Sequence, residues 1–543
     1  MRKLLLLLFI LPITLFSTAQ NGKEPVKVTD MLKIKSISGV TLSKDGSKAV
    51  FTVTSIEPEG DSKLEHKYVS QLWIAGTEGD TKPKQLTTAK ESSSQAVFSP
   101  DGKQLVFVRA VDGRSQLFLL SLEGGEAVQL TKFKYGAVNP KWSPDGKQIL
   151  FSANIPFKEL MKDSLLNPGK ALPKWPMEKP GFENNEQLKP ATTKADPDGS
   201  IEEVRAYLEN NANDKKAKVF TKLNFLDEMD INPDMGFTHF FLIEAKPDAK
   251  STAITKGFYR YNYAEFTPDG KQLILAGNMD STQHPDRALE GEIFIVNTDG
   301  SNLKRILSEN DKNYNSPRLS PSGKWLAFQY GNTSFVSVPA LAIMPLGGSV
   351  KEAIEIPFDR NKGNITWSDD EQYIYFSAQS NGGQPVYRID VKTKKAEQLT
   401  DYNSGTGSFD IAVNKMVLVK TEVANPFEVY TADATGKNQK RISDFNTGWI
   451  ADKKLSFPEK HSFKNEKGME VEYWVMKPSS YEPGKKYPLL LEIHGGPSAM
   501  WGPGESSMWH EYQFFCSKGY GVVYANPRGS GGYGLNFLRA NIN

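Results

Sequence analysis

Ser99-Pro100-Asp101-Gly102-Lys103 is the phrase on which the fold of this chain depends, because it recurs along most of the sequence. In such a phrase proline presets the first turn position, the aspartate side chain caps the turn, and glycine accepts a positive φ. Each copy precedes an apolar run such as Leu105-Val106-Phe107-Val108, which predicts a β-hairpin. The other copies are Ser143-Pro144-Asp145-Gly146-Lys147, Thr267-Pro268-Asp269-Gly270-Lys271 and Ser320-Pro321-Ser322-Gly323-Lys324, with degenerate forms at Ser43–Ser47 and Ser368–Gln372.

A second, strand-like phrase alternates with the turns, and a third cue, Gln-Leu-Thr, follows it at Gln85, Gln129 and Gln398. The spacing of about 40–50 residues is typical of four-stranded propeller blades. We therefore predict an all-β propeller over residues 20–457, with seven blades favoured and eight as the alternative. The seven copies of the second phrase are Leu72-Trp73-Ile74, Leu117-Phe118-Leu119, Phe241-Leu242-Ile243, Ile293-Phe294-Ile295, Leu341-Ala342-Ile343, Val386-Tyr387-Arg388 and Glu428-Val429-Tyr430.

One interval, between Asp145 and Asp269, is more than twice as long as the others and must hold an extra blade, an insertion or both. We place an insertion around residues 155–220. Its first part, Lys158 to Pro190, is rich in Pro, Lys and Glu and lacks strand periodicity, which predicts an exposed excursion.

A helix is predicted within this insertion, over Val204 to Asn210. Ser200 and Glu203 fit a capping box, in which each side chain satisfies the other residue's backbone donor. Capping alone explains these residues. The functional alternative is that Glu202 and Glu203 hold the N-terminal amine of a substrate.

The repeat pattern ends after Phe457-Pro458, and the remainder has a different organisation. Phe463 to Val475 alternates around a turn and predicts a hairpin. Leu489 to Ile493 and Tyr520 to Ala525 each predict a buried strand followed by a glycine-containing turn, with a helix from Met508 to Lys518 between them. Two strand–turn units of this kind predict the N-terminal part of an α/β-hydrolase domain, residues 458–543.

The nucleophile of an α/β-hydrolase sits on a Gly-x-Ser-x-Gly elbow, and no such motif occurs in these 543 residues. We therefore expect the domain to be incomplete and this polypeptide to be inactive by itself. A natural end at Asn543 would leave Val522 to Tyr524 as an unpaired sheet edge with an uncovered apolar face, which is physically unfavourable. Ser498, Ser506, Ser507 and Ser530 lack the elbow context and are not predicted as nucleophiles.

Composition is that of a soluble globular protein, with 38% hydrophobic and 24% charged residues. The net charge of +2, from 66 basic and 64 acidic residues, gives no support to nucleic-acid binding. Six scattered histidines predict neither a metal site nor a cofactor. The single cysteine, Cys516, lies in an aromatic helical stretch and is predicted to be a buried structural thiol.

The N-terminus has the pattern of a signal peptide, residues 1–19. Arg2 and Lys3 form a basic region, Leu4 to Phe16 is almost wholly apolar, and small residues follow before Gln20. The apolar run is short for a membrane span, and no second long one follows. Export to the periplasm or the medium is predicted, without a membrane span after cleavage.

Two motifs in tandem carry a family resemblance. Tyr487-Pro488-Leu489-Leu490-Leu491-Glu492-Ile493-His494-Gly495-Gly496-Pro497 and Asn526-Pro527-Arg528-Gly529-Ser530-Gly531-Gly532-Tyr533-Gly534 follow the predicted propeller. The whole mature chain resembles the prolyl oligopeptidase (S9) family of serine peptidases, within it the acylaminoacyl-peptidase and dipeptidyl-peptidase 5 branches. The resemblance implies hydrolysis of oligopeptides by a Ser-His-Asp mechanism, with the propeller controlling access.

The resemblance also implies roles for particular residues. The turn after the first long hydrolase strand lies beside the oxyanion site in this family, which makes His494, Gly495 and Gly496 candidates for that region. Arg528 and Tyr533 are candidates near the site, where Arg528 either contacts substrate or forms a structural ion pair. His494 is not the triad histidine, which the family places near its C-terminus, and no catalytic residue is assigned among the 543.

A second function class stays open at this point, a non-catalytic binding protein that combines a TolB-like propeller with a vestigial hydrolase lobe. Under the peptidase interpretation the partners are peptide substrates. Aminopeptidase, dipeptidyl-peptidase and endopeptidase action are all compatible with the motifs, and any oligomeric state is compatible with the composition.

Overall fold

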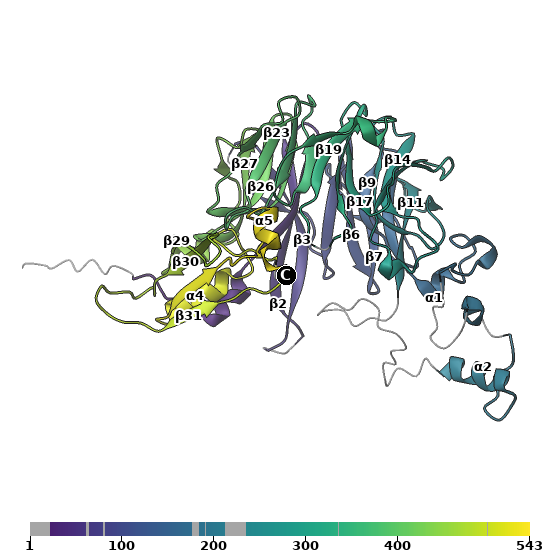
Figure 1. Cartoon of the computed structure of the whole chain (residues 1–543), viewed down its shortest axis with the longest axis horizontal. Helices are drawn as coiled ribbons and strands as arrows, with labels where there is room; N and C mark the ends of the chain where they lie inside the picture. The colour runs from purple at the N-terminus through teal and green to yellow at the C-terminus, as the bar shows by residue number, and fades with distance from the viewer. Residues whose placement is uncertain are drawn as a thin grey trace, which may run out of the picture.

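The computed structural model describes residues 22–60, 64–79, 82–175, 184–189, 192–211, 235–334, 336–496 and 498–542. Most of this part of the chain is β-sheet, and each sheet has four strands. Seven sheets in the described residues are antiparallel and formed by consecutive strands, and an eighth, near the C-terminus, is mixed (Figure 1). The expected signal peptide, residues 1–19, lies outside the described residues.

The strands of the seven antiparallel sheets have the following bounds. The first sheet consists of β1 (Ser36–Leu42), β2 (Lys48–Pro58), β3 (His66–Gly76) and β4 (Lys84–Gln85), and the second of β5 (Ser93–Phe98), β6 (Gln104–Val111), β7 (Arg114–Ser121) and β8 (Val128–Gln129). The third consists of β9 (Val138–Trp142), β10 (Gln148–Pro156), β11 (Gly236–Glu244) and β12 (Thr252–Ala253), and the fourth of β13 (Arg260–Phe266), β14 (Gln272–Asn278), β15 (Glu292–Asn297) and β16 (Lys304–Leu307). The fifth consists of β17 (Lys312–Leu319), β18 (Trp325–Asn332), β19 (Ala340–Pro345) and β20 (Ile354–Ile356), the sixth of β21 (Gly363–Trp367), β22 (Tyr373–Ser377), β23 (Val386–Asp390) and β24 (Ala396–Gln398), and the seventh of β25 (Ser404–Ala412), β26 (Lys415–Glu422), β27 (Asn425–Asp433) and β28 (Lys440–Arg441).

The remaining elements are short. The mixed sheet contains β29 (Pro458–Lys464), β30 (Glu470–Met476), β31 (Leu489–Glu492) and β32 (Gly521–Ala525). The α-helices of the described residues are α1 (Phe157–Leu160), α2 (Ile201–Asn211), α3 (Thr447–Ala451), α4 (Trp509–Ser517) and α5 (Leu535–Leu538), and the 3₁₀ turns are η1 (Val28–Lys33), η2 (Pro168–Lys170), η3 (Asn185–Leu188), η4 (Pro285–Arg287), η5 (Val350–Glu352) and η6 (Arg539–Asn541). No helix in this part of the chain is long and apolar enough to cross a membrane.

The seven antiparallel sheets close into a ring. The first strand of each sheet contacts the preceding sheet, and β25 of the seventh contacts β1 of the first. Buried side chains of both terminal sheets share one apolar cluster, which includes Ile37, Phe51 and Val419. The closure also uses side-chain hydrogen bonds, since the Leu42 amide donates to the Asp410 carboxylate at 2.8 Å. No described sheet contains strands from both ends of the ring, so packing and these bonds hold it shut.

The recurrent phrases occupy equivalent places in the sheets. Each predicted turn phrase joins the first strand of a sheet to the second, and each strand-like phrase lies in the third strand. In the copy at Ser99, the hydroxyl donates to Asp101 at 2.6 Å, and the Asp101 carboxylate accepts from the Lys103 amide at 3.1 Å. Gly102 has a φ of +68°. The turn chemistry predicted from the sequence is therefore the chemistry that forms these hairpins.

The long interval contains an excursion between the second and third strands of the third sheet, β10 and β11. The described residues of this excursion form no additional sheet. Helix α2 begins after Ser200, as predicted, with both bonds of the capping box: the Ser200 amide donates to Glu203 at 2.8 Å, and the Glu203 amide donates to the Ser200 hydroxyl at 3.3 Å.

The mixed sheet has the order β29-β30-β32-β31. The predicted hairpin forms β29 and β30, and β31 pairs with β32 in parallel. One expectation was wrong: β32, with Val522 and Tyr524, is not an edge. It pairs with β30 on one side and β31 on the other, because the hairpin returns to the sheet beside it. The edge is β31, whose Leu489 and Leu491 are 63% and 62% exposed.

Helix α4 packs on one face of this sheet, against β30 and β32. It is the helix predicted between the two strands. Its Tyr512 stacks on Tyr524 of β32 with ring centroids 4.6 Å apart. Cys516 is fully buried in the same cluster, which confirms the prediction of a buried thiol. Burial raises the pKa of the Cys516 thiol to about 11, so the thiol stays protonated near neutrality.

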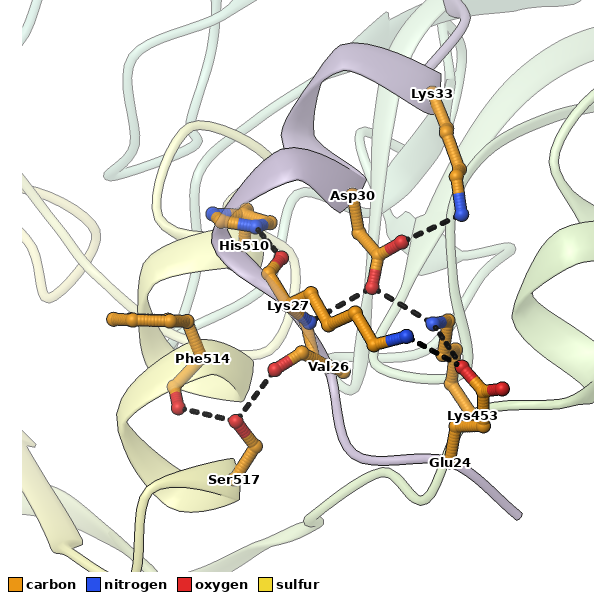
Figure 2. Close-up of polar contacts among 9 residues, drawn as sticks. All are labelled: Glu24, Val26, Lys27, Asp30, Lys33, Lys453, His510, Phe514 and Ser517. Atoms are coloured by element: carbon orange, nitrogen blue, oxygen red, sulfur yellow. Dashed lines mark hydrogen bonds and ion pairs between the residues drawn. The ribbon is translucent and has the colours of Figure 1, made fainter.

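A buried charge cluster ties the N-terminal segment to the segment after α3 (Figure 2). The Asp30 side chain is fully buried and lies 2.9 Å from the Lys453 ammonium, which is 4% exposed. Asp30 also accepts hydrogen bonds from the Lys27 amide and the Lys33 ammonium, both at 2.8 Å. The second carboxylate near Lys453, that of Glu24 at 3.4 Å, is more than half exposed. Asp30 is thus the principal counter-ion of Lys453.

The same segment contacts helix α4 (Figure 2). The Ser517 hydroxyl donates to the Val26 carbonyl at 2.6 Å, and His510 Nε2 lies 3.0 Å from the Lys27 carbonyl. Residues 24–33 therefore connect the end of the seven-sheet ring to the helix that supports the mixed sheet.

Candidate active site

The two parallel strands of the mixed sheet end side by side, and the candidate residues follow them. β31 leads into the turn at His494, and β32 leads into the turn that begins at Asn526. Loops at the carboxyl ends of parallel strands are the usual place for ligands in α/β sheets. His494, Gly495 and Gly496 lie in the first turn. Arg528 and Tyr533 lie in the second.

His494 is a buried contact between the two turns. Its Nε2 lies 3.1 Å from the Ser530 hydroxyl, and its ring meets Trp501 edge-on with centroids 5.5 Å apart. Ser530 is fully buried and donates its single proton to the Pro527 carbonyl at 2.7 Å. His494 Nδ1 also lies 3.1 Å from the Gly495 carbonyl, which can only accept a hydrogen bond. Because the Ser530 hydroxyl is shielded from solvent and already donates to the Pro527 carbonyl, it is not placed as a nucleophile that His494 activates.

Gly495 and Gly496 are exposed in this turn, and neither has a side chain of its own to cover its backbone. Both residues are exposed, and neither amide donates a hydrogen bond to another described residue. Gly496 has a φ of +109°, which disfavours any other residue. Free amides at the end of a strand are the donors from which an oxyanion hole is built.

The two glycines provide a matched pair for mutation. A Cβ at Gly496 would lie 3.3 Å from the Ala499 nitrogen at a positive φ, whereas a Cβ at Gly495 would meet nothing within 4 Å. We expect Gly496→Ala to cost about 1–3 kcal/mol of stability in the turn, and Gly495→Ala to be almost neutral. Urea unfolding followed by tryptophan fluorescence measures both. Equal stability of the two variants would contradict the role assigned to the positive φ.

Asn526 joins the second turn to the chain after the first. Its side chain accepts from the Trp501 amide at 2.8 Å and donates to the Trp501 carbonyl at 2.7 Å. It also donates to the Tyr533 hydroxyl at 3.1 Å. Because Asn526 is fully buried, these bonds fix the relative position of the two loops.

Tyr533 is half-buried and donates its hydroxyl proton to Glu472 of β30 at 2.8 Å. Burial raises the pKa of the Tyr533 hydroxyl well above its ordinary value, and the nearby Glu472 carboxylate raises it further. Tyr533 is therefore a neutral hydrogen-bond donor at any physiological pH, held by a carboxylate.

Arg528 forms an ion pair with Glu466, in the turn between β29 and β30. The guanidinium lies 2.9 Å from the carboxylate, and the two side chains are 35% and 72% exposed. An exposed pair of this kind contributes little to stability. The contact gives Arg528 a structural partner at the margin of the site.

Glu202 and Glu203 lie on α2, away from this region. In Figure 1, α2 and the mixed sheet are at opposite ends of the long axis of the view. Glu203 is engaged in its capping box with Ser200. The structure therefore does not bring these two residues together with the other candidates.

Sequence reasoning missed Trp501, Asn526 and Glu472 as parts of this site. Asn526 was within a motif that was recognised, but its partner Trp501 was not predicted to contact it. Glu472 occupies an alternating strand position like its neighbours, and its role follows only from the pairing of β30 with β32. The signal available in the sequence was the position of Asn526 directly after an apolar strand, where a side-chain amide requires hydrogen-bond partners once it is buried.

The loops of the site also rest on the sixth sheet of the ring. The Asn381 amide donates to the Gly532 carbonyl at 3.2 Å, and the Gly504 amide donates to the Gly382 carbonyl at 3.2 Å. The Leu535 amide donates to the Asp359 carboxylate at 2.9 Å. The candidate site thus lies where the mixed sheet meets the ring.

Comparison with known proteins gives relatives among peptidases. The chain is 27% identical over 547 residues to an uncharacterized peptidase, YuxL, of Bacillus subtilis, covering 95% of this chain and 73% of that protein. It is 24% identical over 286 residues to dipeptidyl-peptidase 5 of Aspergillus fumigatus, covering 50% of this chain and 39% of that protein. No protein-family model matches the chain.

Solved structures share the fold. An acylaminoacyl peptidase in complex with Z-Gly-Gly-Phe-chloromethyl ketone superposes with a TM-score of 0.66 and 18% identity, covering 94% of this chain and 68% of that one. A puromycin-hydrolyzing peptidase of Mycobacterium tuberculosis superposes with a TM-score of 0.62 and 15% identity. The match covers 95% of this chain and 70% of that one. The resemblance to the prolyl oligopeptidase family is confirmed.

The match to this family extends over both parts of the chain. The alignment with the Bacillus peptidase includes the ring of sheets and the mixed sheet, since it covers 95% of the residues. The chain spans about three quarters of that relative and less than half of the Aspergillus dipeptidyl-peptidase 5. The two solved structures match 94% and 95% of this chain, so the shared fold includes both kinds of sheet seen here.

Proposed function

We propose that this chain forms the propeller and the first part of the catalytic domain of an exported serine peptidase that hydrolyses oligopeptides. In this proposal the seven antiparallel sheets are seven blades, and the mixed sheet begins an α/β-hydrolase domain. The closed order of the sheets supports seven blades rather than eight, because β25 contacts β1 directly. The basic and apolar N-terminus supports export.

The observation that carries the proposal at the site is the turn at Gly495 and Gly496. Its exposed amides at the end of β31 have the chemistry needed to stabilise the oxyanion of a tetrahedral intermediate. A donor of this kind contributes about 3–4 kcal/mol to lowering the barrier. The His494–Ser530 contact and the Asn526 bonds hold the turn in place.

The nucleophile, histidine and aspartate of the proposed mechanism are not assigned among the 543 residues, which contain no Gly-x-Ser-x-Gly elbow. The proposal therefore requires a catalytic segment that this chain does not itself include. The ring contacts the site loops and would restrict access to peptides and loose segments. A non-catalytic binding protein is not favoured, because the relative aligned over 95% of the chain is named as a peptidase.

The test compares two polypeptides. Short peptides with a chromogenic leaving group are offered to the 543-residue chain and to a longer product that continues past Asn543 through a Gly-x-Ser-x-Gly elbow, an aspartate and a histidine. We expect no turnover above background from the first and serine-reagent-sensitive cleavage from the second. A folded longer product that cleaves nothing in a broad peptide library would contradict the peptidase function. Serine-reagent-sensitive turnover by the shorter chain would contradict its proposed inactivity.

A further inference from the structure

The inner edge of the ring carries charged residues at equivalent positions on three neighbouring sheets. Lys141 of β9, Glu265 of β13 and Arg318 of β17 each precede the last paired residue before the hairpin turn. The first strands of neighbouring sheets meet here, since the Lys141 ammonium donates to the Ala264 carbonyl at 2.7 Å. One layer of the ring therefore contains two cations and one anion side by side.

Both cations lie over the same aromatic ring. The Lys141 ammonium is 3.9 Å and the Arg318 guanidinium 4.4 Å from the centroid of Tyr263. Contact with an aromatic face attracts a cation, but it does not neutralise the charge. Two like charges held against one ring repel each other, so this arrangement favours a third, negative group.

The nearby Glu265 carboxylate offsets only one of the two positive charges. Glu265 accepts a hydrogen bond from the Tyr263 hydroxyl and another from the Leu319 amide, the latter at 2.9 Å. Within the described ranges, neither Lys141 nor Arg318 forms an ion pair with any carboxylate. Burial lowers the pKa of the Lys141 ammonium to about 8, a shift that the Glu265 charge opposes and the Arg318 charge increases.

Both cations keep unused donors. Lys141 and Arg318 are half-buried, and each bonds a backbone carbonyl of the next sheet, that of Ala264 and that of Ile365 respectively. Arg318 also donates to the Pro317 carbonyl at 2.9 Å. An ammonium has three N–H donors and a guanidinium five, so bridging the sheets leaves donors on each. The bonds between neighbouring sheets explain where these two side chains lie. They do not explain why two cations without an ion-pair partner lie together.

We propose that Lys141 and Arg318 form an anion site on the inner edge of the ring, and that its ligand is a carboxylate of a peptide. The anion site stands on the geometry alone, whereas the choice of a peptide rests on the proposed function. The carboxylate would accept from both cations, as arginine and lysine commonly bind such groups. A peptide held there would be oriented within the ring before it reaches the candidate site.

The first test locates the anion directly. Crystals of the protein are soaked in bromide, and the anomalous signal is mapped. We expect a bromide ion in contact with the Lys141 ammonium and the Arg318 guanidinium. An unoccupied position there, with bromide bound elsewhere in the same crystal, would overturn the site, whether or not the protein is a peptidase.

The second test identifies the ligand by calorimetry with three tripeptides on the 543-residue chain. One has a free C-terminal carboxylate, one is its C-terminal amide, and one is an amide that carries an internal aspartate. A charge-assisted hydrogen bond should make the free acid bind at least roughly tenfold more tightly than the plain amide. Tight binding of the aspartate peptide as well would assign the ligand as any carboxylate. Equal binding of all three would overturn the peptide part.

Variants complete the design. Lys141→Met with Arg318→Met should abolish the preference for the acid. Arg388→Met is the matched control, because Arg388 also lies 4.4 Å from a ring centroid, that of Tyr373, but is paired with Glu397 at 2.7 Å. We expect the control to keep the full preference. Loss of the preference in the control as well would show a general charge effect and contradict a specific site.

Discussion

Replacing Asp30 with asparagine should lower the free energy of unfolding by about 3–5 kcal/mol, because it leaves a buried ammonium without its principal counter-ion. Asp30 is fully buried, and Lys453, 2.9 Å away, is 4% exposed. The asparagine has the same shape, so the effect comes from the charge rather than from packing. Urea denaturation monitored by tryptophan fluorescence measures it.

The control for this substitution is Glu24→Gln. Glu24 also pairs with Lys453, at 3.4 Å, but its side chain is 57% exposed. Because exposed pairs contribute little, this variant should remain close to the native stability. If the two variants lost the same amount, burial of Asp30 would not be the cause.

The same carboxylate makes stability depend on pH. Burial on its own raises the pKa of Asp30, but hydrogen bonds from Lys33, from the Lys27 amide and from Lys453 outweigh it and lower the pKa to about 2. A carboxyl with a lowered pKa stabilises the folded state above its unfolded pKa, near 4, and loses this contribution as the pH falls towards 2. The Asp30→Asn variant should lack this part of the acid destabilisation.

Replacing Glu428 with glutamine should lower the free energy of unfolding by roughly 2–4 kcal/mol. The NH₂ group of glutamine cannot accept the backbone hydrogen bonds that the carboxylate oxygen accepted, and no solvent reaches the site to replace them. Glu428 lies on β27 and is fully buried. Its carboxylate accepts from the amides of Phe445, Asn446 and Thr447 at 3.1, 2.8 and 3.2 Å. It thereby fixes the connection from β28 into α3, next to the segment that contacts residues 24–33.

The measurement for Glu428→Gln is hydrogen exchange of the amides of residues 443–447, together with urea denaturation. We expect these amides to lose protection before the rest of the ring. Glu397→Gln serves as the control, because the Glu397 side chain is 52% exposed in its pair with Arg388, and it should change stability by less than about 1 kcal/mol. Unchanged protection at residues 445–447 would show that the carboxylate does not hold the connection.

Several features of the fold were readable from short stretches of sequence. The turn phrase at Ser99 predicted a hairpin because its three polar contacts all lie within six residues. The helix after Ser200 was predicted from two residues that bond each other. The helix α4 and the two strands around it followed from periodicity and from the glycine that ends the helix.

The candidate site was predicted only in part. Its two turns were recognised from their motifs, but the contact of His494 with Ser530 joins residues from both turns. The pairing of Tyr533 with Glu472 requires β30 to lie beside β32. The sheet edge was assigned to β32 instead of β31 because the strand order appears only in the assembled sheet.

The sequence by itself determined the repeated hairpins, the change of architecture after Phe457 and the glycine turn at the end of β31. Each depends on backbone preferences and on bonds between near neighbours, which a local pattern records. Only the tertiary structure decided the closure of the ring, the meeting of Lys141 and Arg318 over one aromatic ring, and the burial of Asp30 against Lys453. These partners are separated by long stretches of chain, and burial and charge pairing act on them only after the sheets have packed together.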